Sequence, residues 1–351
     1  MTKRLRRASV LALAAAAALA LGAPSAGASG AAASPGSILY AKGGKLWVAS
    51  PDGARKRRVA HSGAFENPSQ ADNGTIVAQR GIDLYRLNRR GRQLNKPITT
   101  AFRTNPLLPA FQGPLWPEVS PDGTRIAYTY SFTAAHFDFG CMCTVVSPSL
   151  NTSYTWANRF TDDPAKTFGL ARFYSQASWI DNRQVLGTTE HLFDYAGNVL
   201  NSVAIDPLGG GEDSYATWFS NCVAGCDSLS TLEMYRLAEG EMTRQRDKLV
   251  FVSGPLHGSA DGSRMQIHRV TGMPPALPPT FCEMSGPNGR FTSPTWSPDG
   301  RSLAWADAKG VWVGRLGDIS GSTCQLTRRL LAPGGTQPDW GPAGPARGFP
   351  R

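Results

Sequence analysis

The side chains best suited to metal or acid–base chemistry are scattered along this chain. Its five histidines occupy unrelated places in the repeated units described below: His61, His136, His191, His257 and His268. A metal centre needs several such ligands to converge on one point. We therefore predict surface or hydrogen-bonded histidines, with no bound metal and no cofactor.

The cysteines are the second set with possible chemistry, and there are six: Cys141, Cys143, Cys222, Cys226, Cys282 and Cys324. The C-x-C and C-x3-C spacings could supply four thiolates to zinc. In an exported chain, disulfides are favoured instead. Cys222 with Cys226 is the first candidate pair, because the loop between them contains glycine and can fold back. Cys282 with Cys324 is the second, and a bridge within Cys141-Met142-Cys143 would be strained.

The sequence contains no motif that would indicate a catalytic nucleophile. No G-x-S-x-G nucleophile elbow occurs, and no paired metal-ligand spacing or phosphate-binding loop is present. We predict no catalytic residues and favour a binding protein over an enzyme.

The N-terminus has the pattern of a secretory signal peptide. Basic residues at positions 3, 4, 6 and 7 precede the apolar run Val10–Leu21, and Ala26-Gly27-Ala28 forms an A-x-A cleavage site. We predict a Sec-type signal over residues 1–28, a linker over 29–37 and a secreted or cell-surface protein. Removing four basic residues lowers the net charge from +10 to +6.

The remaining charge is modest, and its densest run, Arg55–Arg58, is more consistent with an exposed outer strand than with a nucleic-acid groove. No second apolar run reaches membrane length. We therefore predict no nucleic-acid partner, no membrane span and a monomer.

One hairpin pattern occurs twice, 177 residues apart, counting from Ser120 to Ser297. Each copy is a short strand, a Ser-Pro-Asp-Gly turn and a second apolar strand. The turn conformation alone accounts for the Asp and Gly, because Asp accepts hydrogen bonds from local backbone amides and Gly takes a positive φ. We assign structural roles to Asp122, Gly123, Asp299 and Gly300.

The fullest repeat, Pro294–Leu331, contains four short strands, as one antiparallel blade of a β-propeller requires. Weaker copies include Pro68–Ala78 and Gln176–Gly187. The first unit lacks its first strand, because only a second and a third strand are indicated, at Ile38–Ala41 and Lys45–Ala49. Thr336–Gly344 could supply the missing strand. We predict an all-β, six-bladed β-propeller of four-stranded antiparallel blades over residues 38–344, its first blade completed by a C-terminal strand, with a disordered tail over 345–351.

These units resemble the PD40, or WD40-like, repeats of exported bacterial TolB-type β-propellers. The resemblance rests on Val-Ser-Pro-Asp-Gly at 119–123, Trp-Ser-Pro-Asp-Gly at 296–300, and the Ile-Ala-Tyr and Leu-Ala-Trp that follow. It does not extend to TolB itself, which places a separate domain before its propeller. Propeller lyases with similar repeats hold a metal through channel histidines, a pattern that the scattered histidines do not match.

The resemblance implies binding to an unidentified protein or cell-surface glycan at one face of the ring. A channel-centred polysaccharide lyase or hydrolase is the alternative. The long insertions Thr133–Arg172 and Leu208–Leu232 are the candidate binding loops, including the segment His136–Phe139. The recurrent tryptophans are expected to pack between blades: Trp116, Trp179, Trp218, Trp296 and Trp340.

Overall fold

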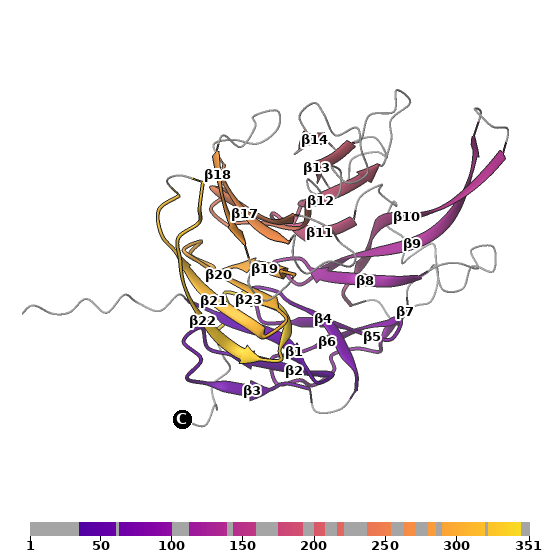
Figure 1. Ribbon diagram of the computed structural model, residues 1–351. Helices are drawn as coiled ribbons and strands as arrows, with labels where there is room; N and C mark the ends of the chain where they lie inside the picture. Colours follow the sequence, from indigo (N-terminus) through magenta and orange to yellow (C-terminus); the bar gives the residue numbers. More distant parts are fainter. Residues whose placement is uncertain are drawn as a thin grey trace, which may run out of the picture. The chain divides into compact units, whose positions relative to one another are not determined.

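The computed structural model describes twelve stretches of the chain: residues 35–60, 63–99, 112–138, 143–158, 175–191, 200–207, 216–220, 237–253, 263–270, 280–285, 290–319 and 322–344. Every named element in these stretches is a β-strand (Figure 1). No helix that could cross a membrane occurs in them.

Antiparallel pairing groups the strands into six sheets, which we number 1 to 6. The first strand given for each sheet below is called its innermost strand. Sheet 1 consists of β23 (Thr336–Gly341), β1 (Ser37–Lys42), β2 (Lys45–Ala49) and β3 (Lys56–Arg58). Sheet 2 consists of β4 (Phe65–Gln70), β5 (Ile76–Arg80), β6 (Asp83–Leu87) and β7 (Ile98–Thr99). Sheet 3 consists of β8 (Gln112–Val119), β9 (Arg125–Asp138) and β10 (Cys143–Trp156).

The other three sheets follow in chain order. Sheet 4 consists of β11 (Ser175–Trp179), β12 (Gln184–His191), β13 (Leu200–Pro207) and β14 (Ala216–Ser220). Sheet 5 consists of β15 (Leu237–Met242), β16 (Lys248–Ser253), β17 (Arg264–Arg269) and β18 (Thr280–Ser285). Sheet 6 consists of β19 (Thr292–Trp296), β20 (Ser302–Asp307), β21 (Gly310–Leu316) and β22 (Leu326–Pro333).

The Ser-Pro-Asp-Gly turns form for local reasons. Ser120 Oγ donates to Asp122 Oδ1 (2.6 Å), and the same oxygen accepts the backbone N–H of Thr124 (2.9 Å). Gly123 has φ of 76° and Gly300 has φ of 65°, a region that favours glycine. Ser297 Oγ likewise donates to Asp299 Oδ1 (2.6 Å).

The same four-residue sequence also occurs at Ser50–Gly53, but there it joins β2 to β3 rather than an innermost strand to its neighbour. Ser50 Oγ donates to Asp52, and Arg55 N–H donates back to Ser50 Oγ (3.0 Å). The turn is therefore set by its own hydrogen bonds and does not by itself mark the start of a repeat.

The innermost strands form a closed series. Each contacts the innermost strand of the next sheet, in the order β4, β8, β11, β15, β19, β23 and back to β4. Six clusters of buried apolar side chains lie between successive sheets, one at each junction. This is a β-propeller arrangement, in which the hydrophobic core is distributed between blades.

The two ends of the described chain meet in sheet 1. β23 pairs antiparallel with β1, with Ile38 opposite Trp340 and Leu39 opposite Asp339. The pairing predicted for the C-terminal strand is therefore present. Five sheets have the predicted four strands, whereas sheet 3 has three in the part of the chain that the structure describes.

One predicted loop is in part a long hairpin. The expected insertion Thr133–Arg172 overlaps β9 and β10, which are 14 residues each and pair continuously from Arg125 opposite Trp156 to Asp138 opposite Cys143. Threonine, valine and aromatic residues favour extended strands, so this insertion lengthens a hairpin. Residues 136–138 of the candidate binding segment lie on β9, and Phe139 lies outside the described residues.

In the second insertion, Leu208–Leu232, only β14 is described, and it carries Trp218. The candidate pair Cys222 and Cys226 lies outside the described residues, as does Cys141.

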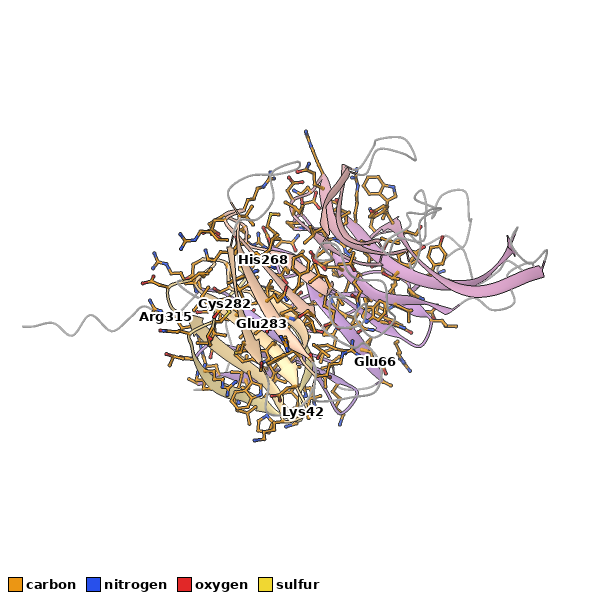
Figure 2. The ribbon with its side chains drawn as sticks, turned by 45° about the horizontal axis from the view of Figure 1, so that its top comes forward. Lys42, Glu66, His268, Cys282, Glu283 and Arg315 are labelled. Carbon is orange, nitrogen blue, oxygen red and sulfur yellow. A yellow bond between two sulfur atoms is a disulfide. The ribbon has the colours of Figure 1, made fainter. Side chains whose placement is uncertain are left out.

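Cys282 and Cys324 form a disulfide with a Cα–Cα distance of 4.8 Å (Figure 2). Both are buried in the cluster between sheets 5 and 6. Beside the bridge, Cys324 N–H donates to the carbonyl of Glu283 (3.1 Å), and Glu283 N–H donates to that of Ser322 (2.8 Å). The segment before β22 thus covers the outer edge of β18 and ties the two sheets together.

Deleting residues 335–351 should destabilise the whole ring, because sheet 1 loses its innermost strand and sheets 2 and 6 lose the strand they contact. We expect the melting temperature to fall by more than about 10 °C, or the protein not to fold. Calorimetry of the truncated protein tests this, with deletion of residues 345–351 alone as the control. Equal melting temperatures for the two truncations would contradict the closing role of β23.

Replacing Cys282 and Cys324 together by alanine should lower the free energy of unfolding. The bridge closes a segment with a sequence separation of 42 residues. Loop entropy for that length corresponds to about 4 kcal/mol. Urea unfolding of the double variant and the oxidised parent measures the difference. A loss below about 1 kcal/mol would show that the covered edge, rather than the bridge, holds the two sheets together.

Candidate binding site in the central channel

Each innermost strand contains a bulge at a corresponding place. One non-glycine residue in each strand has a positive φ, between 46° and 52°: Asn67, Trp116, Gln176, Glu239, Ser293 and Gln337. The strand register shifts at each of these positions. Such a conformation is unfavourable for these residues, so its sixfold recurrence indicates a shared requirement. We call these six residues the bulge ring.

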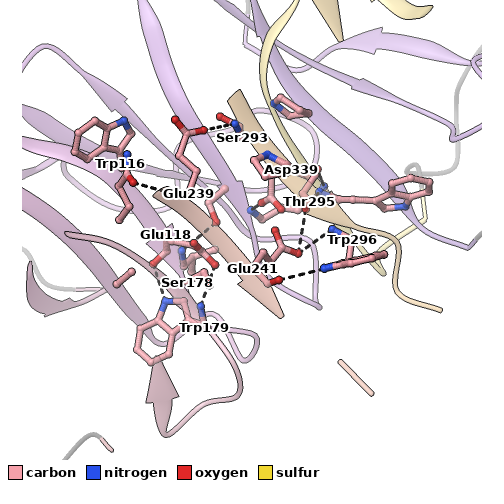
Figure 3. Close-up of a pocket in the computed structure, with 18 of the residues that line it drawn as sticks. Trp116, Glu118, Ser178, Trp179, Glu239, Glu241, Ser293, Thr295, Trp296 and Asp339 are labelled. Carbon is pink, nitrogen blue, oxygen red and sulfur yellow. Dashed lines mark hydrogen bonds between the residues drawn. The ribbon is translucent and has the colours of Figure 1, made fainter. Parts of the chain in front are cut away.

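A second set of side chains lies two residues further along each strand. We call it the acceptor ring, and it consists of Ser69, Glu118, Ser178, Glu241, Thr295 and Asp339. Both rings line one cavity of about 180 Å³ enclosed by the innermost strands (Figure 3). The bulges therefore place two polar residues per sheet in the central channel.

The acceptor ring joins successive sheets through a repeated hydrogen bond. The side-chain oxygen of an acceptor-ring residue accepts a hydrogen bond from a backbone N–H in the next sheet. The donor is the residue directly after the acceptor-ring residue of that sheet. Five of the six steps are made: Ser69 to Val119 (3.1 Å), Glu118 to Trp179 (3.1 Å), Glu241 to Trp296 (2.9 Å), Thr295 to Trp340 (3.1 Å) and Asp339 to Gln70. Each bond satisfies a backbone donor on a strand that forms the edge of its sheet.

A second bond strengthens three of these steps. The indole N–H of Trp179 donates to the carbonyl of Glu118 (2.9 Å), and that of Trp296 donates to the carbonyl of Glu241 (3.1 Å). Gln70 Nε2 makes the corresponding bond to the carbonyl of Asp339 (2.7 Å). These tryptophans are therefore structural, as the sequence predicted, and their apolar rings fill the junctions between sheets.

The bulge ring makes fewer such bonds. Gln337 and Asn67 exchange two, of 2.8 and 2.6 Å, and Gln176 Oε1 accepts the N–H of Glu239 (2.9 Å). Glu239 in turn accepts the N–H of Ser293. The Trp116 side chain has no hydrogen-bond acceptor, so it cannot make the corresponding bond to the next sheet.

The indole of Trp116 is exposed in the described structure, with 38% of its surface accessible, which corrects the prediction that it packs between blades. Its position in the bulge ring directs it toward the channel rather than into a junction (Figure 3). The β9–β10 hairpin of the same sheet continues for several residues beyond the start of β8 (Figure 1). Trp116 and this hairpin therefore lie toward the same mouth of the channel.

The opposite mouth is crossed by an ion pair. Arg244, in the turn after β15, donates two hydrogen bonds to Asp72, in the turn after β4, one of them at 2.7 Å. Sheets 2 and 5 face each other across the ring, so this bidentate pair spans the channel. Gln245 Nε2 also donates to the carbonyl of Pro298 (2.9 Å), which fixes the same turn to sheet 6.

Four carboxyl groups in the two rings have raised pKa values. Burial among the surrounding strands raises the pKa of Glu241 to about 8 and that of Asp339 to about 6. Burial, together with the charges of Glu241 and Asp339, raises the pKa of Glu118 well above its ordinary value. Burial also raises the pKa of Glu239. The channel is thus lined by half-buried acids, and the charges of Glu241 and Asp339 act on Glu118.

The sequence did not single out these acids as site residues. A signal was present, since the acceptor residue directly precedes a tryptophan at 178–179, 295–296 and 339–340. A proline precedes the acceptor residue at 68–69, 117–118, 294–295 and 338–339. Only the circular arrangement shows that these polar residues face one channel.

None of the histidines that the sequence analysis considered belongs to the two rings. His268 is buried on β17 against Phe251, with ring centroids 5.9 Å apart, and burial lowers its pKa to about 4. His136 and His191 are described only in their backbone, and His61 and His257 lie outside the described residues. Across the described ranges, no three His, Cys, Asp or Glu side chains are grouped as metal ligands.

The fold and its channel define a β-propeller protein, and comparison with solved structures agrees. TolB from Acinetobacter baumannii superposes with a TM-score of 0.53 at 13% identity, over 87% of this chain. This chain spans 66% of that TolB chain's length. A putative TolB from Agrobacterium tumefaciens gives 0.47 at 14% identity, over 84% and 88% of the two chains. The likeness to the Acinetobacter baumannii TolB shows a TolB-like propeller fold. No family model and no curated protein matches the sequence.

Glu241→Gln should change how stability depends on pH. A carboxyl with a pKa of about 8 in the folded protein and near 4.5 when unfolded holds its proton more tightly when folded, so stability falls as pH rises between these values. The neutral amide keeps the acceptor for Trp296 without this loss. We expect the variant to unfold at a higher temperature than the parent at pH 8, with the difference shrinking toward pH 5. Thermal melts of both proteins at several pH values test this. A difference in melting temperature that is the same at pH 5 and pH 8 would contradict the assignment.

Proposed function

We propose that this protein is an exported β-propeller scaffold that binds a segment of a partner protein at the channel mouth bearing Trp116. The exposed indole of Trp116 carries the proposal. It is held in an unfavourable backbone conformation at the rim of a polar channel, where its counterparts in other sheets make inter-sheet bonds. The backbone conformation is common to all six innermost strands, so Trp116 is distinguished by its exposed indole, an apolar and rigid contact surface.

The partner surface in this proposal extends from the channel mouth onto the β9–β10 hairpin. A large indole on a rigid rim provides apolar contact area at low entropic cost. The β9–β10 hairpin extends beyond the start of β8 and adds further surface at the same mouth. The protein is proposed to act as a monomer. A glycan is the other ligand class, because exposed tryptophan also stacks on sugar rings.

Export is also part of the proposal. The pattern of residues 1–28 predicts cleavage of a signal peptide, and the Cys282–Cys324 disulfide is typical of oxidising compartments. The mature chain would comprise a linker over 29–37, a single propeller over 38–344 and a tail over 345–351. We propose six blades, supported by six sheets and six corresponding bulges.

The alternative from the sequence, a channel-centred polysaccharide lyase or hydrolase, makes a separate prediction. An enzyme related to the metal-dependent propeller lyases would retain stoichiometric manganese, calcium or zinc through dialysis. Elemental analysis of the purified protein therefore distinguishes it from a scaffold.

Trp116→Ala should weaken ligand binding without affecting the fold. We expect a random peptide library displayed on phage to yield binders of the parent whose affinity falls by about tenfold or more in the variant. Trp156→Ala is the matched control, because Trp156 lies in the same sheet, is 40% exposed and stacks with Arg125 near the opposite face. A glycan array screened in parallel tests the other ligand class. Binders that tolerate Trp116→Ala but not Trp156→Ala would place the site on the other face.

A further inference from the structure

The acceptor ring is incomplete at one step. By the pattern of the other five steps, Ser178 would accept the backbone N–H of Met242, but the Ser178 hydroxyl has no hydrogen-bond partner in the described structure. The residue is only 4% exposed, and it lines the cavity. A buried hydroxyl without a partner is costly, so this one is a candidate contact for a ligand.

The neighbours of Ser178 in the ring are both acids. Glu118 precedes it in sheet 3, and Glu241 follows it in sheet 5 (Figure 3). Each uses one carboxylate oxygen, Oε1, for the bond to the next sheet. A carboxylate has two oxygens, so each has a second acceptor in addition to the one that holds the ring together.

We propose that the channel binds an alkylammonium group, the end of a lysine side chain on the partner, between Glu118, Ser178 and Glu241. This inference rests on the proposed function, and it names the chemistry that the site recognises.

The arrangement of acceptors favours ammonium over guanidinium. An ammonium group is a compact charge with three donors, and the proposed acceptors come from three successive strands of a ring. A guanidinium group is a planar fork that is best matched by one carboxylate approached in its plane. The four-carbon lysine stem would pass the indole of Trp116, where it gains apolar contact and a cation–π contribution.

The closed mouth fixes the direction of entry. Arg244 lines the same cavity, but Asp72 holds its guanidinium across the far end of the channel. A cation would therefore enter from the Trp116 mouth and stop at the acceptor ring, before it reaches the positive charge of Arg244.

The charges around the site predict how binding depends on pH. Glu118, Glu239, Glu241 and Asp339 face the channel, with Arg244, Asp72 and Arg290 beside them. Burial raises the pKa of all four acids, so an arriving cation displaces protons. Because an alkylammonium group stays charged to about pH 10, its affinity should rise as pH increases from about 6 to 9.

The test uses n-butylammonium chloride, which reproduces the lysine side chain, added to the full mature protein. Indole N–H signals in two-dimensional NMR report binding, because Trp179 and Trp296 donate to residues of the acceptor ring. Sodium chloride at equal ionic strength and 1-butanol are the controls for charge and for the apolar stem. We expect saturable shifts with butylammonium alone.

Three variants locate the site. Glu118→Gln and Glu241→Gln keep an acceptor for the ring bond while removing the charge, and we expect about tenfold weaker binding in each. Ser178→Ala removes a hydroxyl without a partner, so we expect an unchanged melting temperature and about threefold weaker binding. Glu66→Gln is the matched control, since Glu66 (labelled in Figure 2) is an exposed acid on β4 that does not line the cavity.

Two results would overturn the proposal. One is binding of butylammonium no tighter than that of sodium or butanol. The other is binding that Ser178→Ala and both glutamine variants leave unchanged while they remain folded. If either occurs while library peptides still depend on Trp116, the binding function stands and the lysine assignment fails. If library selection fails while butylammonium binds as expected, the channel takes an ammonium group but its source is not a partner peptide.

Discussion

The structure depends on the bond that each innermost strand makes to the next through the acceptor ring. Apolar clusters pack successive sheets together, and the side-chain bond adds a directional contact at the channel because it joins one specific acceptor to one specific backbone N–H. Five of the six junctions contain this bond. The positive-φ bulges follow from the same requirement, because they turn the acceptor residue toward the adjacent sheet.

The choice of acceptor determines the chemistry of the channel. Serine and threonine make the bond without charge at Ser69 and Thr295, whereas Glu118, Glu241 and Asp339 make it with a carboxyl group. Partial burial makes a carboxyl harder to ionise, so three such groups around one channel oppose stability at neutral pH. A neutral acceptor would suffice for the ring bond alone. The acids therefore add an electrostatic property that the fold does not need.

The two mouths of the channel differ in a way that suits one-sided binding. The Arg244–Asp72 pair spans one mouth between opposite sheets, while the other has the exposed Trp116 and the hairpin that begins beside it. An exposed ion pair contributes little to stability, so its position matters more than its energy. At the periphery, the Cys282–Cys324 bridge and the segment beside it cover one sheet edge and leave the channel face unchanged.

The sequence alone determined the all-β class, the four-strand unit and the closure by the C-terminal strand, because turns and alternating strands are local patterns. Ser120–Gly123 folds through bonds within four or five residues, so its sequence is sufficient to predict it. The sequence also indicated that Cys282 could pair with Cys324. It did not reveal the channel, because Glu118, Glu241 and Asp339 are far apart in the chain and each looks like an ordinary strand residue. Only the closed ring brings them together, since convergence on an axis is a property of all six sheets at once.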